Sequence, residues 1–529
     1  MAEEPRKSPA PVLAAPLRWA EDRIHFSSGL HTQLNKVFPG RWSFMLGEIA
    51  LYSFVVLLIS GTYLALFFDP SMTEVTYHGD YTPADGLLMS RAFASALDLS
   101  FDVRGGLLMR QIHHWAALVF VAAILVHMMR IFFSGAFRRP REANWVVGLL
   151  MLVIAIVEGF AGYSMPDDLL SGTGLRIASG IMLAIPVLGS WIHWLVFGGE
   201  FPGEQIIPRL FTAHVFLLPG LLVALVSVHL GLVWRQKHTQ RPGPQRTERN
   251  VVGTRIVPSF AAKSSALFVA VAGVMTLMGG LFQINPIWNY GPYDPLQGSA
   301  GSQPDWYIAW VDGAARIWPA WEITLGGYRI PAPFWPTVAM PVTVVLVAMC
   351  YPWIEKRLTG DRAHHNLLDR PRDAPMRSGL GAMALTFVTV LLASGFNDII
   401  ALEFDFNLDV VVWVGRFAIL LLPPLAYAVT YRACRGLQTR DRKVLKEGIE
   451  TGIVVRRPDG QFVEIHQPLG SVREDGERDK PGYAGAPVPR RPNDLGLAGT
   501  PLPGSLILPD PPEETEALHR ARSEGTDGH

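Results

Sequence analysis

Four histidines lie in two long apolar stretches of the sequence and form two pairs, His113 with His127 and His214 with His229. The members of each pair are fourteen and fifteen residues apart, respectively. On an α-helix, these separations leave rotations of about −40° and +60° from whole turns and an axial distance of about 21–22 Å. Each pair therefore lies near one face of its helix. Two such helices side by side would present two stacked bis-imidazole sites, a geometry that suits two haems conducting electrons across a bilayer.

A fifth histidine, His114, competes with His113 for the role of ligand. It lies thirteen residues before His127, a rotation of about 140° on an α-helix, so His114 and His127 point to different sides. We therefore assign the ligand role to His113 and not to His114.

The elements that carry these histidines are predicted membrane spans. Of the 529 residues, 49% are hydrophobic and only 17% are charged. Several apolar stretches exceed twenty residues, which indicates a polytopic membrane protein and not a soluble fold. The formal net charge is zero, so charge gives no reason to expect nucleic-acid binding. We predict an all-α polytopic membrane protein in which the first four of eight transmembrane helices form a dihaem bundle. The predicted spans are 43–67, 107–133, 145–165, 209–234, 263–283, 333–354, 378–396 and 411–431.

Basic residues alternate between the predicted loops. The N-terminus and the loops after the second, fourth and sixth spans are rich in Lys and Arg, whereas the other loops have few or none. By the positive-inside rule, both termini are expected in the cytoplasm of a bacterial plasma membrane. Counting the apolar segment 174–199 as a span would reverse every later loop, and Pro186 interrupts it. We expect this segment to form short helices on the external surface.

The predicted organisation has five parts. Residues 450–468 alternate apolar and polar side chains around Asp459-Gly460, which predicts a hairpin, and residues 470–529 have the composition of a disordered segment. The two cysteines form no CxxC pattern, which excludes a disulfide framework, an all-cysteine iron–sulfur cluster and a c-type haem site. The parts are a cytoplasmic N-terminal segment (1–42), the dihaem bundle (43–234), a cytoplasmic loop (235–262), a four-span C-terminal region (263–431) and a cytoplasmic tail (432–529).

Glycines on the flanking spans repeat the histidine spacing. Gly47 and Gly61 lie in the first span, Gly148 and Gly162 lie in the third, and both pairs are fourteen residues apart. Glycine leaves a gap because it has no side chain, so these positions predict room for two flat macrocycles at the levels of their ligands.

Three arginines lie close to the histidine levels. Arg110 precedes His113 by one turn, Arg130 follows His127 by one turn, and Arg209 begins the fourth span. Arginine pairs well with carboxylates, so these residues are candidate partners of haem propionates.

Longer stretches of the sequence resemble the cytochrome b subunit of quinol–cytochrome c reductases. RQIHHWAALVFVAAILVHMMRIFFSGAFRRPRE resembles the family's second helix, and RLFTAHVFLLPGLLVALVSVHLGLVW resembles its fourth. GFAGYSMPDD is similar to the turn that ends the third helix, and PDWY is similar to the family's PEWY quinol-site motif. TGDRAHHNLLDRPRD and the long tail are similar to the actinobacterial branch. The resemblance covers roughly residues 41–432.

The resemblance implies a subunit of a proton-translocating menaquinol:cytochrome c oxidoreductase with two b-type haems. His113 and His214 would hold an outer, low-potential haem, and His127 and His229 an inner, high-potential haem. The implied partners are a Rieske iron–sulfur subunit, a cytochrome c subunit, a terminal oxidase, a second copy of the chain and the lipid membrane. Menaquinol would be oxidised at the outer side, and menaquinone reduced at the inner side.

Carboxylates near the outer site are the expected proton acceptors. By resemblance, Asp305 of the PDWY motif is the first candidate, with Tyr307 beside it, although most of the family has Glu there. The shorter side chain raises the alternative that a water lies between Asp305 and quinol. Asp312 and Glu158 are further candidates, and Tyr163 belongs to the turn against which quinol would bind.

The inner quinone site is predicted from fewer residues. FAAKSSA resembles the stretch that opens the family's fifth helix, and Lys263 matches its lysine, whereas the neighbouring family aspartate is Ser264 here. Glu48, beside Gly47, is a candidate proton carrier.

Three other functions compete with this interpretation. A non-redox transporter would bind no haem. A transmembrane ferric-type reductase also uses histidine pairs, but it needs a dinucleotide-binding GxGxxG unit that the tail lacks. A dihaem membrane-anchor cytochrome would have fewer spans and no PDWY loop.

Overall fold

The structure is a computed structural model that describes residues 19, 23, 33–243, 245–298, 303–469, 481–483, 485, 488 and 489. Among these residues, eight helices are long and apolar enough to cross a membrane, which confirms the predicted all-α membrane fold. The spans consist of α3 (Leu46–Ala65), α5 (Gly106–Phe133), α6 (Glu142–Ser164), α9–η3–α10 (Ile206–Thr212, Ala213–Leu217 and Leu218–Gln236), η4–α11 (Ile256–Phe260 and Ala261–Leu281), η6–α13 (Trp335–Ala339 and Met340–Thr359), α14 (Pro375–Ser394) and α16 (Leu408–Glu447).

Shorter helices connect the spans. The segment 174–199 contains two helices with Pro186 in the break between them, so it is not one continuous span. Asp168 begins the first of these helices because its side chain accepts hydrogen bonds from the backbone N–H groups of Leu170 and Ser171. The short helices and turns are α4 (Arg91–Phe101), α7 (Leu169–Leu183), α8 (Gly189–Phe197), α12 (Trp306–Ile317), α15 (Asn397–Glu403), η1 (Trp42–Phe44), η2 (Thr82–Ala84), η5 (Ile287–Asn289) and η7 (Pro371–Asp373).

The strands form small antiparallel pairs. The pairs are β1 (Val37–Phe38) with β4 (Thr254–Arg255), β2 (Glu74–Thr76) with β3 (Leu88–Ser90), β5 (Ile323–Leu325) with β6 (Tyr328–Ile330), and β7 (Ile449–Arg456) with β8 (Phe462–Gln467). In the last pair, the turn contains Asp459 and Gly460, and Gly460 has a φ of 87°, a conformation that favours glycine. The predicted disordered segment 470–529 lies almost wholly outside the described residues.

The helix α16 extends well beyond the predicted span 411–431. It contains 40 residues and continues to Glu447. The added part, from Arg432 onwards, is polar but rich in Arg, Leu, Gln and Lys, which all have high helix propensity. The hydropathy pattern marks only the apolar part of such a helix, so the predicted boundary was too early.

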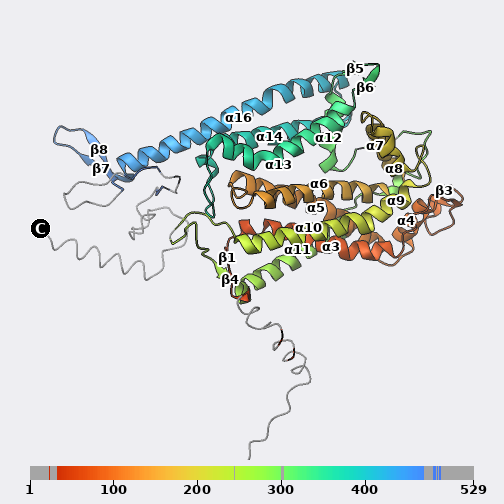
Figure 1. Cartoon of the computed structure of the whole chain (residues 1–529), viewed down its shortest axis with the longest axis horizontal. Coiled ribbons are helices and arrows are strands. Elements are labelled where there is room, and N and C mark those ends of the chain that lie inside the picture. Colours follow the sequence, from red (N-terminus) through yellow and green to blue (C-terminus); the bar gives the residue numbers. More distant parts are fainter. Residues whose placement is uncertain are drawn as a thin grey trace, which may run out of the picture. The chain divides into compact units, whose positions relative to one another are not determined.

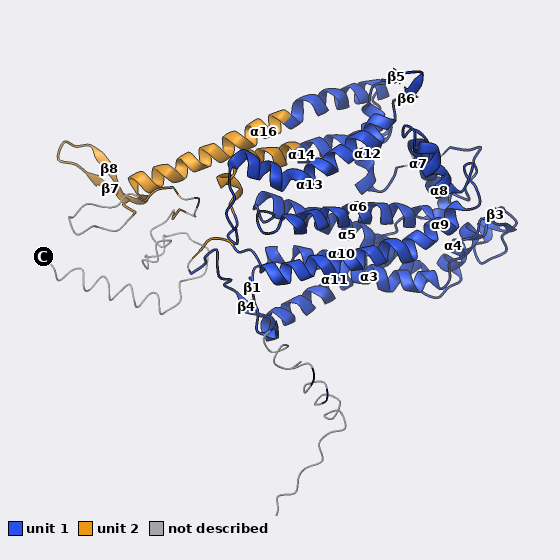
Figure 2. Ribbon diagram, in the orientation of Figure 1, with its two compact units in different colours: residues 1–240, 245–368, 384–423 blue, residues 241–244, 369–383, 424–529 orange. Residues whose placement is uncertain are grey.

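The chain divides into two compact units (Figure 2). The first comprises residues 1–240, 245–368 and 384–423, and the second comprises residues 241–244, 369–383 and 424–529. In the first unit, α3 packs on α5 and α6 packs on α10, and these four helices run side by side (Figure 1). Their core contains Phe54 and Phe120, whose rings stack with centroids 5.4 Å apart, between the levels of the two histidine pairs.

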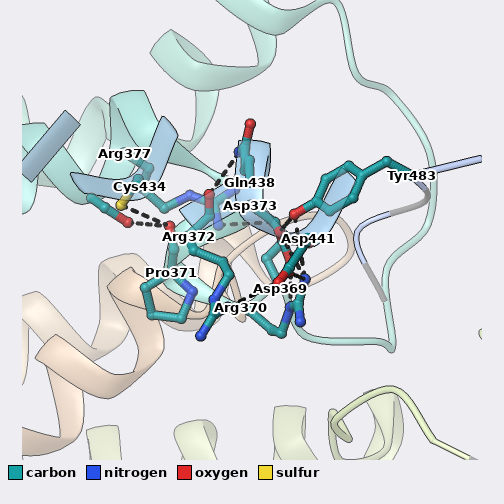
Figure 3. Close-up of polar contacts among 11 residues, drawn as sticks. Asp369, Arg370, Pro371, Arg372, Asp373, Arg377, Cys434, Gln438, Asp441 and Tyr483 are labelled. Carbon is teal, nitrogen blue, oxygen red and sulfur yellow. Dashed lines mark hydrogen bonds and ion pairs between the residues drawn. The ribbon is translucent and has the colours of Figure 1, made fainter. Parts of the chain in front are cut away.

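The second unit is held together by charged side chains (Figure 3). Arg370 binds Asp373 at 2.6 Å and the buried Asp441 of α16 at 3.2 Å. Arg372 approaches the other oxygen of Asp441 at 3.5 Å, and the hydroxyl of Tyr483 donates to Asp373. These contacts fix the loop that precedes α14 against the polar end of α16.

Candidate functional site

The four histidines of the sequence analysis face one another in two pairs across α5 and the α9–α10 span. The ring centroids of His113 and His214 lie 6.1 Å apart, and those of His127 and His229 lie 6.4 Å apart. Two imidazoles on opposite sides of one metal ion, each about 2 Å from it, place their centroids about 6 Å apart. Both pairs therefore have the separation that one haem iron with two axial imidazoles requires. We call them the first pair (His113 and His214) and the second pair (His127 and His229).

In the first pair, the Nδ1 atom of each histidine has a polar partner in the protein. Nδ1 of His113 lies 2.9 Å from the hydroxyl of Ser60 on α3. Nδ1 of His214 donates to the backbone carbonyl of Glu158 at 3.0 Å and lies 3.1 Å from the carboxylate of the same residue. A ring nitrogen held in this way fixes the orientation of the imidazole and leaves Nε2 for a metal ion. In the second pair, Nδ1 of His127 is buried and has no hydrogen-bond partner among the described residues.

A π-helical turn accounts for the different sequence separations of the two histidines on each helix, fourteen residues on α5 and fifteen on the α9–α10 span. His214 lies within η3, a π-helix over Ala213–Leu217 in the middle of the span. A π turn holds about one residue more than an α turn. It therefore absorbs the fifteenth residue between His214 and His229, and the two histidines return to one face. This turn explains why the rotation of about +60° expected for a regular helix does not separate them.

Three of the four spaced glycines lie against the histidines. A Cβ atom added to Gly47 would lie 3.1 Å from Cε1 of His127, and one added to Gly61 would lie 3.0 Å from Cε1 of His113. At Gly162 the added atom would lie only 2.4 Å from Cε1 of His214, a distance at which the ring must move. A Cβ at Gly148 would meet no atom within 4 Å, and Gly148 lines a cavity. The glycines therefore allow α3 and α6 to approach the imidazole edges closely.

A cavity of about 230 Å³ surrounds the first pair, and we call it the first cavity. Arg110 lies in its wall and donates through Nη2 to the backbone carbonyl of Asn285 at 2.7 Å. Its Nη1 is buried and has no partner among the described residues, so an anionic group such as a propionate fits there. Other predicted residues that line this cavity are Gly61, Glu158, Gly162, Tyr163, Asp305 and Tyr307.

Asp305 enters the first cavity from the start of α12 and is held at both oxygens. The hydroxyl of Tyr307 donates to one carboxylate oxygen at 2.8 Å, and Nε2 of His114 lies 3.3 Å from the other. Burial and the neighbouring Asp305 raise the pKa of Tyr307 well above its usual value, so it is a neutral donor. The Tyr307 ring fits against α6 because residue 159 is glycine, where a Cβ would lie 2.2 Å from the Tyr307 hydroxyl oxygen.

A cavity of about 100 Å³ surrounds the second pair, and we call it the second cavity. Its wall carries Arg130, Arg141 and Lys237, and no carboxylate is among the described residues that line it. His238 also lines it, and burial, together with the nearby Arg130 and Arg141, lowers the pKa of His238 to about 4. This imidazole is therefore neutral at pH 7, and the arginines and the lysine make the wall basic.

Two predicted residues lie away from both cavities. Arg209 is exposed and donates to the backbone carbonyls of Trp194 and Leu195 near the end of α8, so its guanidinium supports the surface helices. Asp312 forms an ion pair of 2.7 Å with Arg316, one turn further along α12. Burial raises the pKa of Asp312, although Arg316 opposes this shift. Arg209 is close to His214 in the sequence, and Asp312 is close to PDWY, but this proximity does not show which way either side chain points.

The candidate inner residues form a separate cluster beside the second cavity. The hydroxyl of Ser264 on α11 donates to the carboxylate of Glu48 on α3 at 2.5 Å, and the hydroxyls of Ser264 and Tyr52 are hydrogen-bonded. The neighbouring Lys263 extends toward Gly40, where a Cβ would lie 3.9 Å from Nζ. Neither Glu48 nor Lys263 lines the second cavity.

Sequence reasoning missed the contacts of Ser60, Gly159 and Ser264 and the contact of His114 with Asp305. Gly159 lies three residues before Gly162 and shares its helix, which was an available signal. The partners of the other three depend on contacts between helices, which their spacing along the chain does not encode.

Comparisons with known proteins show the family to which the chain belongs. The family described as "Cytochrome b(N-terminal)/b6/petB" matches residues 118–292. The chain is 59% identical to the cytochrome bc1 complex cytochrome b subunit of Mycobacterium tuberculosis, over 98% of this chain and 95% of the relative. The corresponding subunit of Corynebacterium diphtheriae is 56% identical over 93% of this chain and 91% of the relative. That of Streptomyces coelicolor is 48% identical over 88% and 86%.

A solved structure has a similar fold. It is described as "Hyperthermophilic respiratory Complex III", and its TM-score is 0.58 at 23% sequence identity. The match covers 78% of this chain and 99% of that chain. This likeness concerns the arrangement of the helices alone.

Proposed function

The chain belongs to the cytochrome b family as the cytochrome b subunit of a respiratory bc1 complex, and on this premise we propose that it oxidises menaquinol at an outer site and reduces menaquinone at an inner site. Eight apolar helices and this family make it an integral protein of the plasma membrane and part of an oxidoreductase. The finer assignment rests on the two cavities described above.

The histidine pairs are the proposed axial ligands of two b-type haems. When bound, these haems supply an electron path between the two sides of the membrane. The observation that carries the assignment is that both pairs have the centroid separation of a bis-imidazole iron site. Glycines support it by admitting the imidazole edges, and Arg110 and Arg130 each offer a cation beside one pair.

The direction of the protein follows from its basic loops. Since His113 pairs with His214 and His127 with His229, α5 and α10 run in the same direction. Both helices continue from the second pair into basic segments, 138–141 and 235–241. By the positive-inside rule, we place the second cavity at the cytoplasmic side, the first cavity at the outer side and both termini in the cytoplasm.

Quinol would bind in the first cavity, between Tyr163 at the end of α6 and Asp305 at the start of α12. Oxidation of one quinol releases two protons and two electrons. Asp305 is the proposed first proton acceptor, because Tyr307 and His114 hold its carboxylate at the cavity wall. Glu158 is the second acceptor, since one of its carboxylate oxygens is buried without a hydrogen-bond partner among the described residues.

Other subunits must complete this reaction. The described cysteines do not combine with other side chains into a metal-binding group, so a Rieske iron–sulfur subunit and a cytochrome c subunit are the proposed electron acceptors at the outer side. A terminal oxidase and a second copy of the chain are further proposed partners, by resemblance to the actinobacterial branch.

At the inner side, we propose that Glu48 delivers protons to quinone and that Ser264 and Tyr52 hold its carboxylate in place. The supporting observation is the half-buried hydrogen-bonded cluster that these three side chains form between α3 and α11. Lys263, next to Ser264, would stabilise negative charge on the reduced ring.

Haem spectra of the purified complex test this proposal. We expect two b-type haems in the wild type, loss of one in His214→Ala and loss of the other in His229→Ala, with quinol oxidation abolished in the first variant. His193→Ala is the matched control, because His193 is buried and bonded to Ser179 but lies outside both cavities. Unchanged haem content in both ligand variants would contradict the assignment. Retention of both wild-type haems without quinol oxidation would favour an anchor cytochrome instead.

A further inference from the structure

We propose that His114 is a positioning residue for quinol oxidation: it holds the Asp305 carboxylate against the first cavity. This inference rests on the proposed function of Asp305. His114 follows the first-pair ligand His113 directly, yet it makes a different contact. His113 faces His214 and Ser60, whereas His114 reaches Asp305, 191 residues further along the chain.

The position of Asp305 makes a second support necessary. Asp305 is the N-cap residue of α12, where an aspartate ordinarily accepts hydrogen bonds from the first turn of its own helix. Here its side chain makes no such bond and turns toward the cavity instead. The alternative partners are Tyr307 at 2.8 Å and His114 at 3.3 Å, one for each carboxylate oxygen.

The two partners come from different elements. Tyr307 belongs to α12 itself, is 3% exposed and fits into the space left by Gly159, so it moves with the Asp305 backbone. His114 belongs to α5, which also carries His113. Of these two partners, only His114 ties the Asp305 carboxylate to the helix that bears a proposed haem ligand. Both side chains are mostly buried, with 16% and 17% of their surfaces exposed, so water competes little with this contact.

The chemistry of the contact gives His114 a defined task. With Asp305 ionised, Nε2–H of His114 donates to one carboxylate oxygen, and each oxygen keeps a lone pair for a quinol hydroxyl. Aspartate is short, and its carboxylate must be held at the edge of its reach to meet the substrate. Without His114, the carboxylate could rotate back to cap α12, and the proton acceptor would leave the cavity wall.

Steady-state kinetics of the intact complex with a soluble menaquinol analogue test this inference. We expect His114→Ala to lower kcat by about 10- to 100-fold, the value of one hydrogen bond to a charged group. The KM should change little, since the contact acts on the reacting carboxylate. His114→Gln should stay within about threefold of the wild type, because its amide N–H can replace Nε2–H. Both b-haem spectra should persist in every variant.

A double-mutant cycle separates positioning from a purely structural role. In an Asp305→Asn background, His114→Ala should cost less than about twofold, because residues that act through one another are not additive. Wild-type kcat in His114→Ala, an equally slow His114→Gln, or an equal loss in the Asp305→Asn background would each overturn the inference. If His114→Ala lost haem, the inference would be tested with His114→Gln instead, by comparing its effect on kcat in the wild-type and Asp305→Asn backgrounds. Wild-type turnover in Asp305→Asn alone, with both haems present, would instead refute the proposed role of Asp305.

Discussion

The two cavities share a design, with a histidine pair between the same helices, but they differ in the charges on their walls. The first cavity carries the carboxylates of Glu158 and Asp305 and a single arginine, Arg110. The second carries Arg130, Arg141 and Lys237, without a carboxylate among its described lining residues. Their immediate support differs as well, because Glu158 contacts His214 whereas Nδ1 of His127 has no partner among the described residues.

This difference suits the two ends of the bundle to the different tasks proposed for them. Carboxylates can accept the protons that an oxidised quinol releases, so the first cavity suits oxidation. Positive charge stabilises an added electron, so the second cavity suits the more reducible haem. An electron that moves from the first pair to the second therefore moves toward positive charge. The basic wall favours the direction of transfer that the proposed function requires.

The largest effect is expected from Gly162→Ala. The new Cβ would lie 2.4 Å from His214, so the ligand ring must leave its position, and we expect loss of the first haem and of quinol oxidation. The haem difference spectrum and turnover of the complex measure both effects.

Gly148→Ala provides the matched comparison for Gly162→Ala. A Cβ there meets no protein atom within 4 Å, so the variant should fold normally and lose the second haem only if a macrocycle occupies that space. A Gly162→Ala protein with both haems and normal turnover would show that the two ends tolerate side chains equally.

Glu48→Gln should act only at the inner end. It removes a carboxylate that Ser264 contacts at 2.5 Å, and we expect reoxidation of the second haem by quinone to slow by about tenfold. Flash or stopped-flow kinetics with the outer site inhibited would measure this rate. Tyr52→Phe keeps the carboxylate and should have a smaller effect, so an equal loss in both variants would assign the role to the hydroxyl instead.

Glu158→Gln should slow quinol oxidation, because it removes the proposed second proton acceptor, and should shift the midpoint potential of the first haem but not that of the second. The carboxylate lies 3.1 Å from Nδ1 of His214 and would make that imidazole a stronger donor to a haem iron. Its removal should raise the midpoint potential by about 30–60 mV, equivalent to a three- to tenfold change in a one-electron equilibrium. Redox titration would resolve the two haems. A shift of the second haem of the same size would mean that the cavities are not independent.

The smallest effect on turnover is expected from a change outside both cavities. Arg370→Gln removes a guanidinium that binds Asp373 and Asp441 in the second unit, and should weaken that unit locally by about 1–2 kcal/mol. Hydrogen exchange over residues 432–447 should accelerate while turnover stays within about twofold of the wild type. A loss of haem in this variant would show that haem binding depends on more than the residues of the two cavities.

The sequence predicted those features that repeat with a helical period. Hydropathy predicts the eight spans. The spacings of fourteen and fifteen residues predict that the histidines can form two bis-imidazole pairs. The π turn at Ala213–Leu217 could not be predicted, because an extra residue changes the helix without changing its composition.

Contacts between distant elements were beyond such patterns. The sequence shows that His114 faces away from His127, but its contact with Asp305 depends on where α12 packs. Arg209 and Asp312 lie away from the cavities for the same reason, because each side chain has another partner, the end of α8 or Arg316. Proximity along the chain gives the level of a side chain but not its direction.

The division of glycines and histidines among four helices has a consequence for biogenesis. The contacting glycines belong to α3 and α6, whereas the histidines belong to α5 and the α9–α10 span. Neither pair exists until the fourth of these helices has been inserted beside the first three. A nascent chain that stops before His214 can therefore hold neither cofactor through two histidines. Haem capture would then report that the bundle is complete, before α11 and the later helices are needed.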